Sequence, residues 1–162
     1  MLASEIGRCL VERQIVPGNL IGARLGIDPV QLEHQVLNGT RVRHPGGKRL
    51  GDSVVSLGLP SKGFGRQYRE IRRQVRITRA MGSATLSLTY VANGRFDAYV
   101  QWSKLSLWDI CAAGVIALEG GAVVTSCQGT AWFELGMPSK SIGIAAASPQ
   151  HHQAYLDLLV DG

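Results

Sequence analysis

The chain has 162 residues, of which 45% are hydrophobic and 18% are charged. This composition excludes a disordered protein and is sufficient for one domain with a hydrophobic core. No apolar run reaches the roughly 20 residues that a membrane span needs, and residues 1–20 lack the pattern of a signal peptide. We therefore expect a soluble, cytoplasmic protein.

The cysteines and the charges narrow the function classes further. Cys9, Cys111 and Cys127 have no CxxC spacing, so they predict neither a disulfide framework nor a zinc site, and we expect small buried thiols. The net charge of +5 is uneven, because basic residues gather in two groups. These are Arg41, Arg43, Lys48 and Arg49, and then Arg66, Arg69, Arg72, Arg73, Arg76 and Arg79. Such a field attracts anions.

The N-terminal part carries one clear pattern. Leu2, Ile6 and Leu10 recur at helical spacing and predict an amphipathic helix over residues 2–14. Residues 30–37 fit either a strand or a short helix. His34 and His44 have no partner at ligand spacing, so we expect ordinary surface or turn residues.

Residues 53–58 have the β-branched content of a strand, and residues 65–73 follow as a basic helix. For this helix we expect a solvated face rather than nucleic-acid binding, because there is no recognised binding motif and little aromatic interleaving. Residues 74–78 predict a short strand. Ser83 predicts the N-cap of the next helix, and Asn93-Gly94 its end.

The second half predicts further alternation of strands and helices. Residues 95–101 alternate as a strand, and 102–107 are expected to form a loop. Then follow a helix over 109–119, strands over 122–126 and 142–147, and a final helix that opens with Ser148 as cap and Pro149 at its first position. His151 and His152, in the first turn of that helix, are expected to face solvent. Nearly continuous apolar strands between helices indicate an α/β fold with a buried, largely parallel sheet.

Asp109 directly follows Trp108 and is predicted to open a helix. There the helix dipole and the free N–H groups favour the ionised carboxylate. Two interpretations stay open: a capping aspartate, or a hard ligand for Mg²⁺. A lone carboxylate cannot hold a catalytic magnesium ion, which needs further carboxylates and substrate oxygens. Gly82 lets the backbone come close to an anion at the start of the preceding helix.

Four blocks in this sequence resemble, in the same order, the C-terminal half of the inositol monophosphatase family, which comprises Mg²⁺-dependent, lithium-sensitive phosphomonoesterases. They are residues 79–84 (RAMGSA), 90–99 (YVANGRFDAY), 108–114 (WDICAAG) and 119–125 (EGGAVVT). The resemblance covers residues 40–162, and residues 1–39 form a poorly matched N-terminal segment. It implies an α/β half-domain with a mixed, mostly parallel sheet flanked by helices, like the C-terminal part of the family's αβαβα sandwich.

The resemblance also implies roles for individual residues. In this family clustered magnesium ions activate a water and stabilise the transferring phosphoryl group of a phosphorylated small molecule. The role of metal ligand falls on Asp109, and the residues that line the substrate are Gly82, Ser83 and Ala84. Relatives usually carry an acidic residue that contacts substrate hydroxyls at the position held here by Gln101, and the following loop is one residue longer. The substrate preference therefore stays open.

The family's other metal ligands are missing from this sequence. Relatives carry them in a Gly-Glu-Glu type segment and an Asp-Pro-Ile-Asp-Gly-Thr type segment, and neither occurs in these 162 residues. Asp28-Pro29 is followed by Val30-Gln31-Leu32, without a second aspartate. We therefore expect a protein that keeps one half of the active site and is weakly active or inactive alone.

Two alternatives stay open beside this reading. One is an enzyme whose metal ligands come from a partner chain or from Asp28, Glu33 and Glu119. The other is a non-catalytic anion-binding or protein-interaction module that uses the arginine-rich surface. Because a half-fold would leave apolar surface exposed, we also expect a homodimer.

Overall fold

The computed structural model describes residues 36–37, 40–46, 48–58, 64–134, 137, 140 and 142–160. The predicted helix over 2–14 lies outside these residues, as do Cys9, Asp28, Glu33 and His34.

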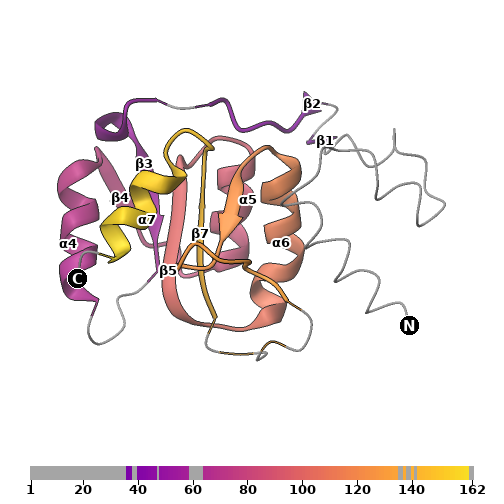
Figure 1. Ribbon diagram of the computed structural model, residues 1–162. Coiled ribbons are helices and arrows are strands. Elements are labelled where there is room, and N and C mark those ends of the chain that lie inside the picture. The colour runs from indigo at the N-terminus through magenta and orange to yellow at the C-terminus, as the bar shows by residue number, and fades with distance from the viewer. Residues whose placement is uncertain are drawn as a thin grey trace.

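A mixed sheet of five strands forms the centre of the described chain (Figure 1). Its strand order is β4-β3-β5-β7-β6. The strands are β3 (Val54–Leu57), β4 (Ile77–Arg79), β5 (Ala98–Leu105), β6 (Val123–Thr125) and β7 (Ile142–Ala147). β3 pairs in parallel with β4 and β5, whereas β7 pairs antiparallel with β5 and β6. The sheet is mixed, as predicted, but only the two pairings of β3 are parallel and the two pairings of β7 are antiparallel, so it is half rather than mostly parallel.

Helices cover both faces of this sheet. α4 (Gly65–Gln74) and α7 (His152–Val160) lie on one face, and α5 (Ala84–Ala92) and α6 (Leu107–Glu119) lie on the other (Figure 1). Each face has its own hydrophobic cluster. Because side chains alternate along a strand, Tyr99 of β5 packs with Leu88 and Ile110 under α5 and α6, whereas Val100 packs with Ile71 and Tyr155 under α4 and α7. This arrangement confirms the layered α/β fold.

Smaller elements precede the sheet. β1 (Val36–Leu37) and β2 (Thr40–Arg41) form an antiparallel pair, and a 3-10 turn, η1 (Leu50–Asp52), leads into β3. Within the described ranges, no helix is both long and apolar enough to cross a membrane.

Three predicted boundaries differ from the structure. The loop predicted over residues 102–107 is wrong, because β5 continues to Leu105. Trp102 and Leu105 are buried there, and Lys104 takes a positive φ of 69° in the irregular stretch between them. β4 begins at Ile77 rather than at residue 74, since α4 extends through Gln74. α6 begins at Leu107, so Asp109 is its third residue rather than its first.

The start of the last helix also differs from its prediction. Residues 149–151 form a turn, in which the Ser148 carbonyl accepts hydrogen bonds from the N–H groups of His151 and His152, and α7 begins only at His152. His152 is not solvent-facing as predicted, because its exposed fraction is 6% and its Nε2 lies 3.1 Å from the hydroxyl of Thr125. Cys127 is buried, as expected of a small thiol, whereas Cys111 is half-buried.

Candidate functional site

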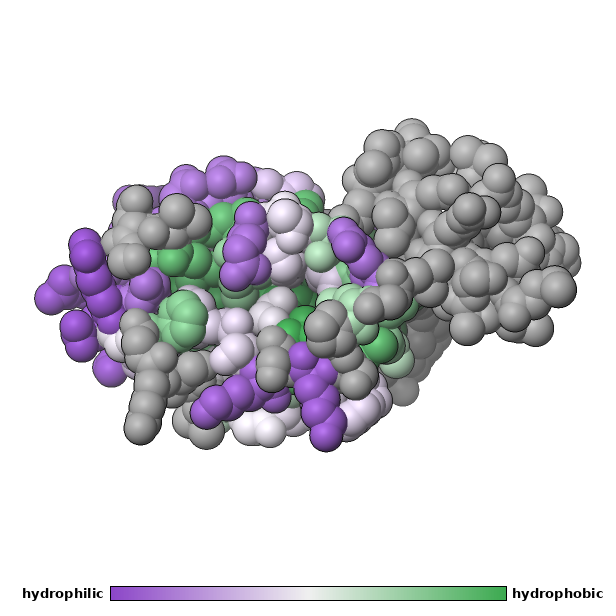
Figure 2. Space-filling model, turned by 60° about the horizontal axis from the view of Figure 1, so that its bottom comes forward, coloured by the Kyte–Doolittle hydropathy of each residue, from purple (hydrophilic) through white to green (hydrophobic). Residues whose placement is uncertain are grey.

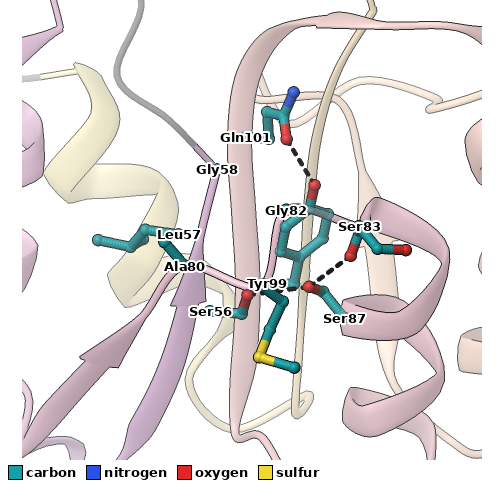
Figure 3. Close-up of a pocket in the computed structure, with 10 residues that line it drawn as sticks. Ser56, Leu57, Gly58, Ala80, Gly82, Ser83, Ser87, Tyr99 and Gln101 are labelled. Carbon is teal, nitrogen blue, oxygen red and sulfur yellow. Dashed lines mark hydrogen bonds between the residues drawn. The ribbon is translucent and has the colours of Figure 1, made fainter.

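A pocket of about 250 Å³ opens where β3 ends and α5 begins (Figure 3). Its walls come from β3, β5, the first turns of α5 and the segment that joins β4 to α5. The residues that line it are Ser56, Leu57, Gly58, Ala80, Met81, Gly82, Ser83, Ser87, Tyr99 and Gln101. Among them are Gly82, Ser83 and Gln101, three of the residues predicted to contact a substrate.

The N-terminus of α5 shapes one side of the pocket. Gly82 has a φ of +69°, a conformation that glycine adopts without strain, and it turns the chain into the helix. Ser83 is the N-cap, and its hydroxyl accepts a hydrogen bond from the N–H of Leu86 at 3.2 Å. Ala84, the fourth predicted substrate residue, begins α5 and packs into the core instead of lining the pocket.

Gln101 is held in a fixed orientation on β5. Its Oε1 accepts a hydrogen bond from the Tyr99 hydroxyl at 2.7 Å, and its Nε2 donates to the carbonyl of Ser103 at 2.9 Å. Gly58 packs against this amide: a Cβ placed on Gly58 would stand 2.6 Å from Cδ of Gln101. Burial raises the pKa of Tyr99 well above its ordinary value, so its hydroxyl stays a neutral donor. Gln101 therefore presents an ordered, uncharged group to the pocket.

Buried hydroxyls also line the pocket (Figure 3). The Ser87 hydroxyl donates its single proton to the Ser83 carbonyl at 2.8 Å. In the 2.9 Å hydrogen bond between Ser87 and Ser56, the Ser56 hydroxyl must therefore be the donor. The sequence did not predict Ser56, Ser87 or Tyr99 as residues of the site. A signal for Ser56 exists, since it is the one polar residue of the otherwise apolar strand β3.

Asp109 lies outside this pocket wall and acts as a helix cap. Its Oδ2 accepts a hydrogen bond from the N–H of Ser106 at 2.9 Å, which completes a capping box at the start of α6. The hydroxyl of Thr85 donates to the Asp109 carbonyl at 2.7 Å and ties the first turn of α6 to that of α5. Trp108, beside it, is 67% exposed.

The described residues do not by themselves fit a magnesium site. Among them no group of three His, Cys, Asp or Glu side chains lies close enough to hold a metal ion. Mg²⁺ prefers near-octahedral oxygen ligation, which one half-buried carboxylate already engaged in a helix cap does not provide.

Comparison with known proteins decides the family. The model of the inositol monophosphatase family matches residues 50–161. The chain belongs to the inositol monophosphatase family. An inositol-1-monophosphatase of Rhizobium meliloti is 37% identical over 100 residues, which are 57% of this chain and 37% of that protein. The Nus factor SuhB of Pseudomonas aeruginosa is 31% identical over 123 residues, which are 66% of this chain and 45% of that protein.

Solved structures of family members agree with this assignment. The extragenic suppressor protein SuhB of Bartonella henselae superimposes with a TM-score of 0.69 at 27% identity, over 80% of this chain and 49% of that one. The IMPase of Thermotoga maritima gives a TM-score of 0.65 at 28% identity, over 76% of this chain and 46% of that one. The chain therefore spans about half the length of these two solved family members. The predicted family and fold are confirmed.

Proposed function

We propose that this chain forms the substrate-facing half of a phosphomonoesterase site and binds a phosphorylated small molecule in the pocket at α5. The observation that carries this proposal is the placement of Gly82, Ser83 and Gln101 around one pocket. The exposed N–H groups and the dipole at the start of a helix favour an anionic group such as phosphate. The uncharged hydroxyls and amide beside it suit the hydroxyls of the same molecule.

We also propose that the chain alone is weakly active or inactive. In the family Mg²⁺ supplies an activated water and a positive charge for the phosphoryl group. Asp109 would contribute one carboxylate, and the missing ligands would have to come from a partner chain or from acidic residues such as Asp28 and Glu33. An enzyme that is completed in this way, with metal ligands from a partner chain or from Asp28, Glu33 and Glu119, is the alternative function.

Hydrolysis of inositol 1-phosphate and of 3′-phosphoadenosine 5′-phosphate, with and without Mg²⁺, tests the proposal. We expect no magnesium-dependent turnover by the chain alone, and a rise in Tm when inositol 1-phosphate is added, because a ligand of the folded state stabilises it. Asp109→Asn serves as the control. Magnesium-dependent turnover that this variant loses would contradict inactivity and favour the completed enzyme.

A homodimer is part of the same proposal. The large apolar side chains exposed among the described residues are Met81, Leu86 and Trp108, at 37%, 38% and 67%. They all lie at or beside the first turns of α5 and α6, and burial in a second copy would remove this apolar surface from water. Light scattering at micromolar concentration tests the dimer, and a purely monomeric protein would contradict it.

A further inference from the structure

The arginines of α4 and of the segment after it form a surface apart from the pocket, which we call the α4 surface. It comprises Arg66, Arg69, Arg72, Arg73, Arg76 and Arg79, and all six are exposed. Glu70 is the one acidic residue from position 64 to position 80, so this stretch has a formal charge of +5. That equals the formal charge of the whole chain, and the remaining residues are therefore neutral in total.

The fold directs these side chains outward. Ile71 and Val75 are buried and anchor α4 on the hydrophobic cluster that it shares with α7. Hydrophilic residues gather at the left of the molecule in Figure 2, the side on which Figure 1 places α4. No residue of α4 lines the pocket described above.

This arrangement works against the stability of the isolated helix. Arg66 and Arg69 are like charges at i,i+3, Arg69 and Arg73 are like charges at i,i+4, and each such pair is destabilising by about 0.2–0.5 kcal/mol. The first turn contains no acidic residue, so Arg66 faces the positive end of the helix dipole. Among the described residues, the one ion pair of the six arginines joins Arg73 to Glu70 at 2.8 Å. Arg72 and Arg73 lie in the last turn of α4, where the helix dipole favours cations. Helix stability therefore accounts for these two arginines but not for Arg66 and Arg69, whose repulsion a bound polyanion would relieve.

The spacing and chemistry of the side chains indicate the kind of polyanion. Arg66 and Arg73 are about 10 Å apart along the helix axis, given the rise of about 1.5 Å per residue, so the row can contact more than one phosphate of a chain. Guanidinium groups match phosphate oxygens with a two-pronged fork. A helix that binds a membrane surface also presents large apolar side chains for insertion, and the exposed ones, Met81, Leu86 and Trp108, do not belong to α4.

We propose that the α4 surface binds the phosphate backbone of a nucleic acid without base-sequence preference. The sequence alone favours a solvated helix face. The structure adds that all six arginines are exposed and that, among the described residues, they have a single counter-charge. Phosphate contacts of this kind carry affinity but no sequence information.

Fluorescence anisotropy of the full chain with labelled oligo(dT), single-stranded RNA of random sequence and a DNA duplex tests this proposal. The test variant is R66Q/R69Q/R76Q, and the matched control R41Q/R43Q/R95Q removes three exposed arginines from other elements. We expect the test variant to bind at least about tenfold more weakly at low salt, and its slope of log K against log salt to shrink by about 2 for single strands. The control variant keeps the slope of the wild type.

Several outcomes would overturn the proposal. One is that the wild type does not bind at low salt, and another is that both triple variants lose the same affinity for nucleic acid. A third is that the protein binds polyglutamate or anionic vesicles more tightly than nucleic acid at matched charge. If the triple variant does not fold, the single variants Arg66→Gln and Arg69→Gln replace it, each with an expected decrease in slope of about 0.7. R66K/R69K/R76K keeps the charge and is expected to keep the slope, so a loss of slope there would also contradict a phosphate-backbone surface.

Discussion

The Tyr99 hydroxyl donates a 2.7 Å hydrogen bond to Oε1 of Gln101, and both side chains line the pocket at α5. Tyr99 is 2% exposed, and removal of its hydroxyl leaves Oε1 of Gln101 without this donor. We expect Tyr99→Phe to lower the free energy of unfolding by about 1 kcal/mol in urea denaturation.

Tyr90→Phe is the matched control for this prediction. The ring of Tyr90 packs edge-on against Phe96, with 5.3 Å between the ring centroids, and within the described residues no hydrogen bond of its hydroxyl is found. We expect a change below about 0.5 kcal/mol, the range of surface substitutions. Equal effects of the two substitutions would show that the Tyr99–Gln101 bond contributes nothing measurable.

Acid should destabilise the fold through His152. Burial lowers the pKa of His152 below its ordinary value of 6.5, although the Ala145 carbonyl opposes this shift. Because the pKa is lower in the folded state, the unfolded chain binds the proton more tightly. The contribution of neutral His152 to the free energy of unfolding is therefore present above pH 6.5 and is lost as the pH falls below it. His44, whose pKa burial also lowers, acts in the same direction.

His152→Gln separates the two histidines. Thr125 donates its hydroxyl proton to the Ser126 carbonyl at 2.8 Å, so its oxygen accepts from Nε2–H of His152, and a glutamine amide is also a donor. We expect this variant to be less stable than the wild type at neutral pH. Between neutral and acidic pH, its free energy of unfolding should fall by less than that of the wild type. Thermal unfolding at a series of pH values measures this, and parallel profiles would assign the acid sensitivity to His44 or to other groups.

Local chemistry explains which parts of the fold the sequence predicts. The ends of α5 are specified by Ser83 and by Asn93-Gly94, residues that act within one helical turn, and the structure places both as predicted. The predicted start of α6 at Asp109 is wrong, because Ser106 and Asp109 together form a capping box and the helix begins at Leu107.

Contacts between distant segments explain what the sequence does not predict. His152 contacts Thr125, 27 positions earlier, and β5 extends to Leu105 because that residue pairs with Ile142 of β7. In the pocket, the two-residue period places Tyr99 and Gln101 on one face of β5. The orientation of the Gln101 amide also requires the space that Gly58 leaves, and no pattern within β5 contains this information.

Gly114 permits α6 to lie close to a buried aromatic ring. A Cβ at this position would stand 2.7 Å from Cη2 of Trp132, whose exposed fraction is 1%. We expect Gly114→Ala to destabilise the protein by about 1–3 kcal/mol through overpacking, measured by thermal or urea unfolding.

Gly65→Ala is the control for this prediction. Gly65 begins α4, and the nearest atom to a Cβ there is Nη1 of the flexible Arg69 at 3.7 Å. The alanine should be neutral or stabilise the helix by up to about 1 kcal/mol, because glycine loses more backbone entropy on folding. A Gly114→Ala variant as stable as this control would mean that Trp132 repacks without cost.

Substitutions of Asp109 can distinguish its role as a cap from a role as a metal ligand. Asp109→Ala removes the acceptor for the Ser106 N–H and should lower the free energy of unfolding by about 1 kcal/mol. Asp109→Asn keeps a carbonyl oxygen as acceptor and should lower the free energy of unfolding by only about 0.3 kcal/mol. Urea unfolding of both variants beside the wild type measures the difference.

The same variants test for magnesium. Because the described residues offer no cluster of three ligands, we expect millimolar Mg²⁺ to leave the Tm of the chain unchanged. If Mg²⁺ raised the Tm of the wild type but not that of Asp109→Asn, which keeps the cap and loses the charge, the carboxylate would be a ligand and further ligands would have to join it. Such a result would also contradict the proposal that the chain alone is inactive for want of a metal site.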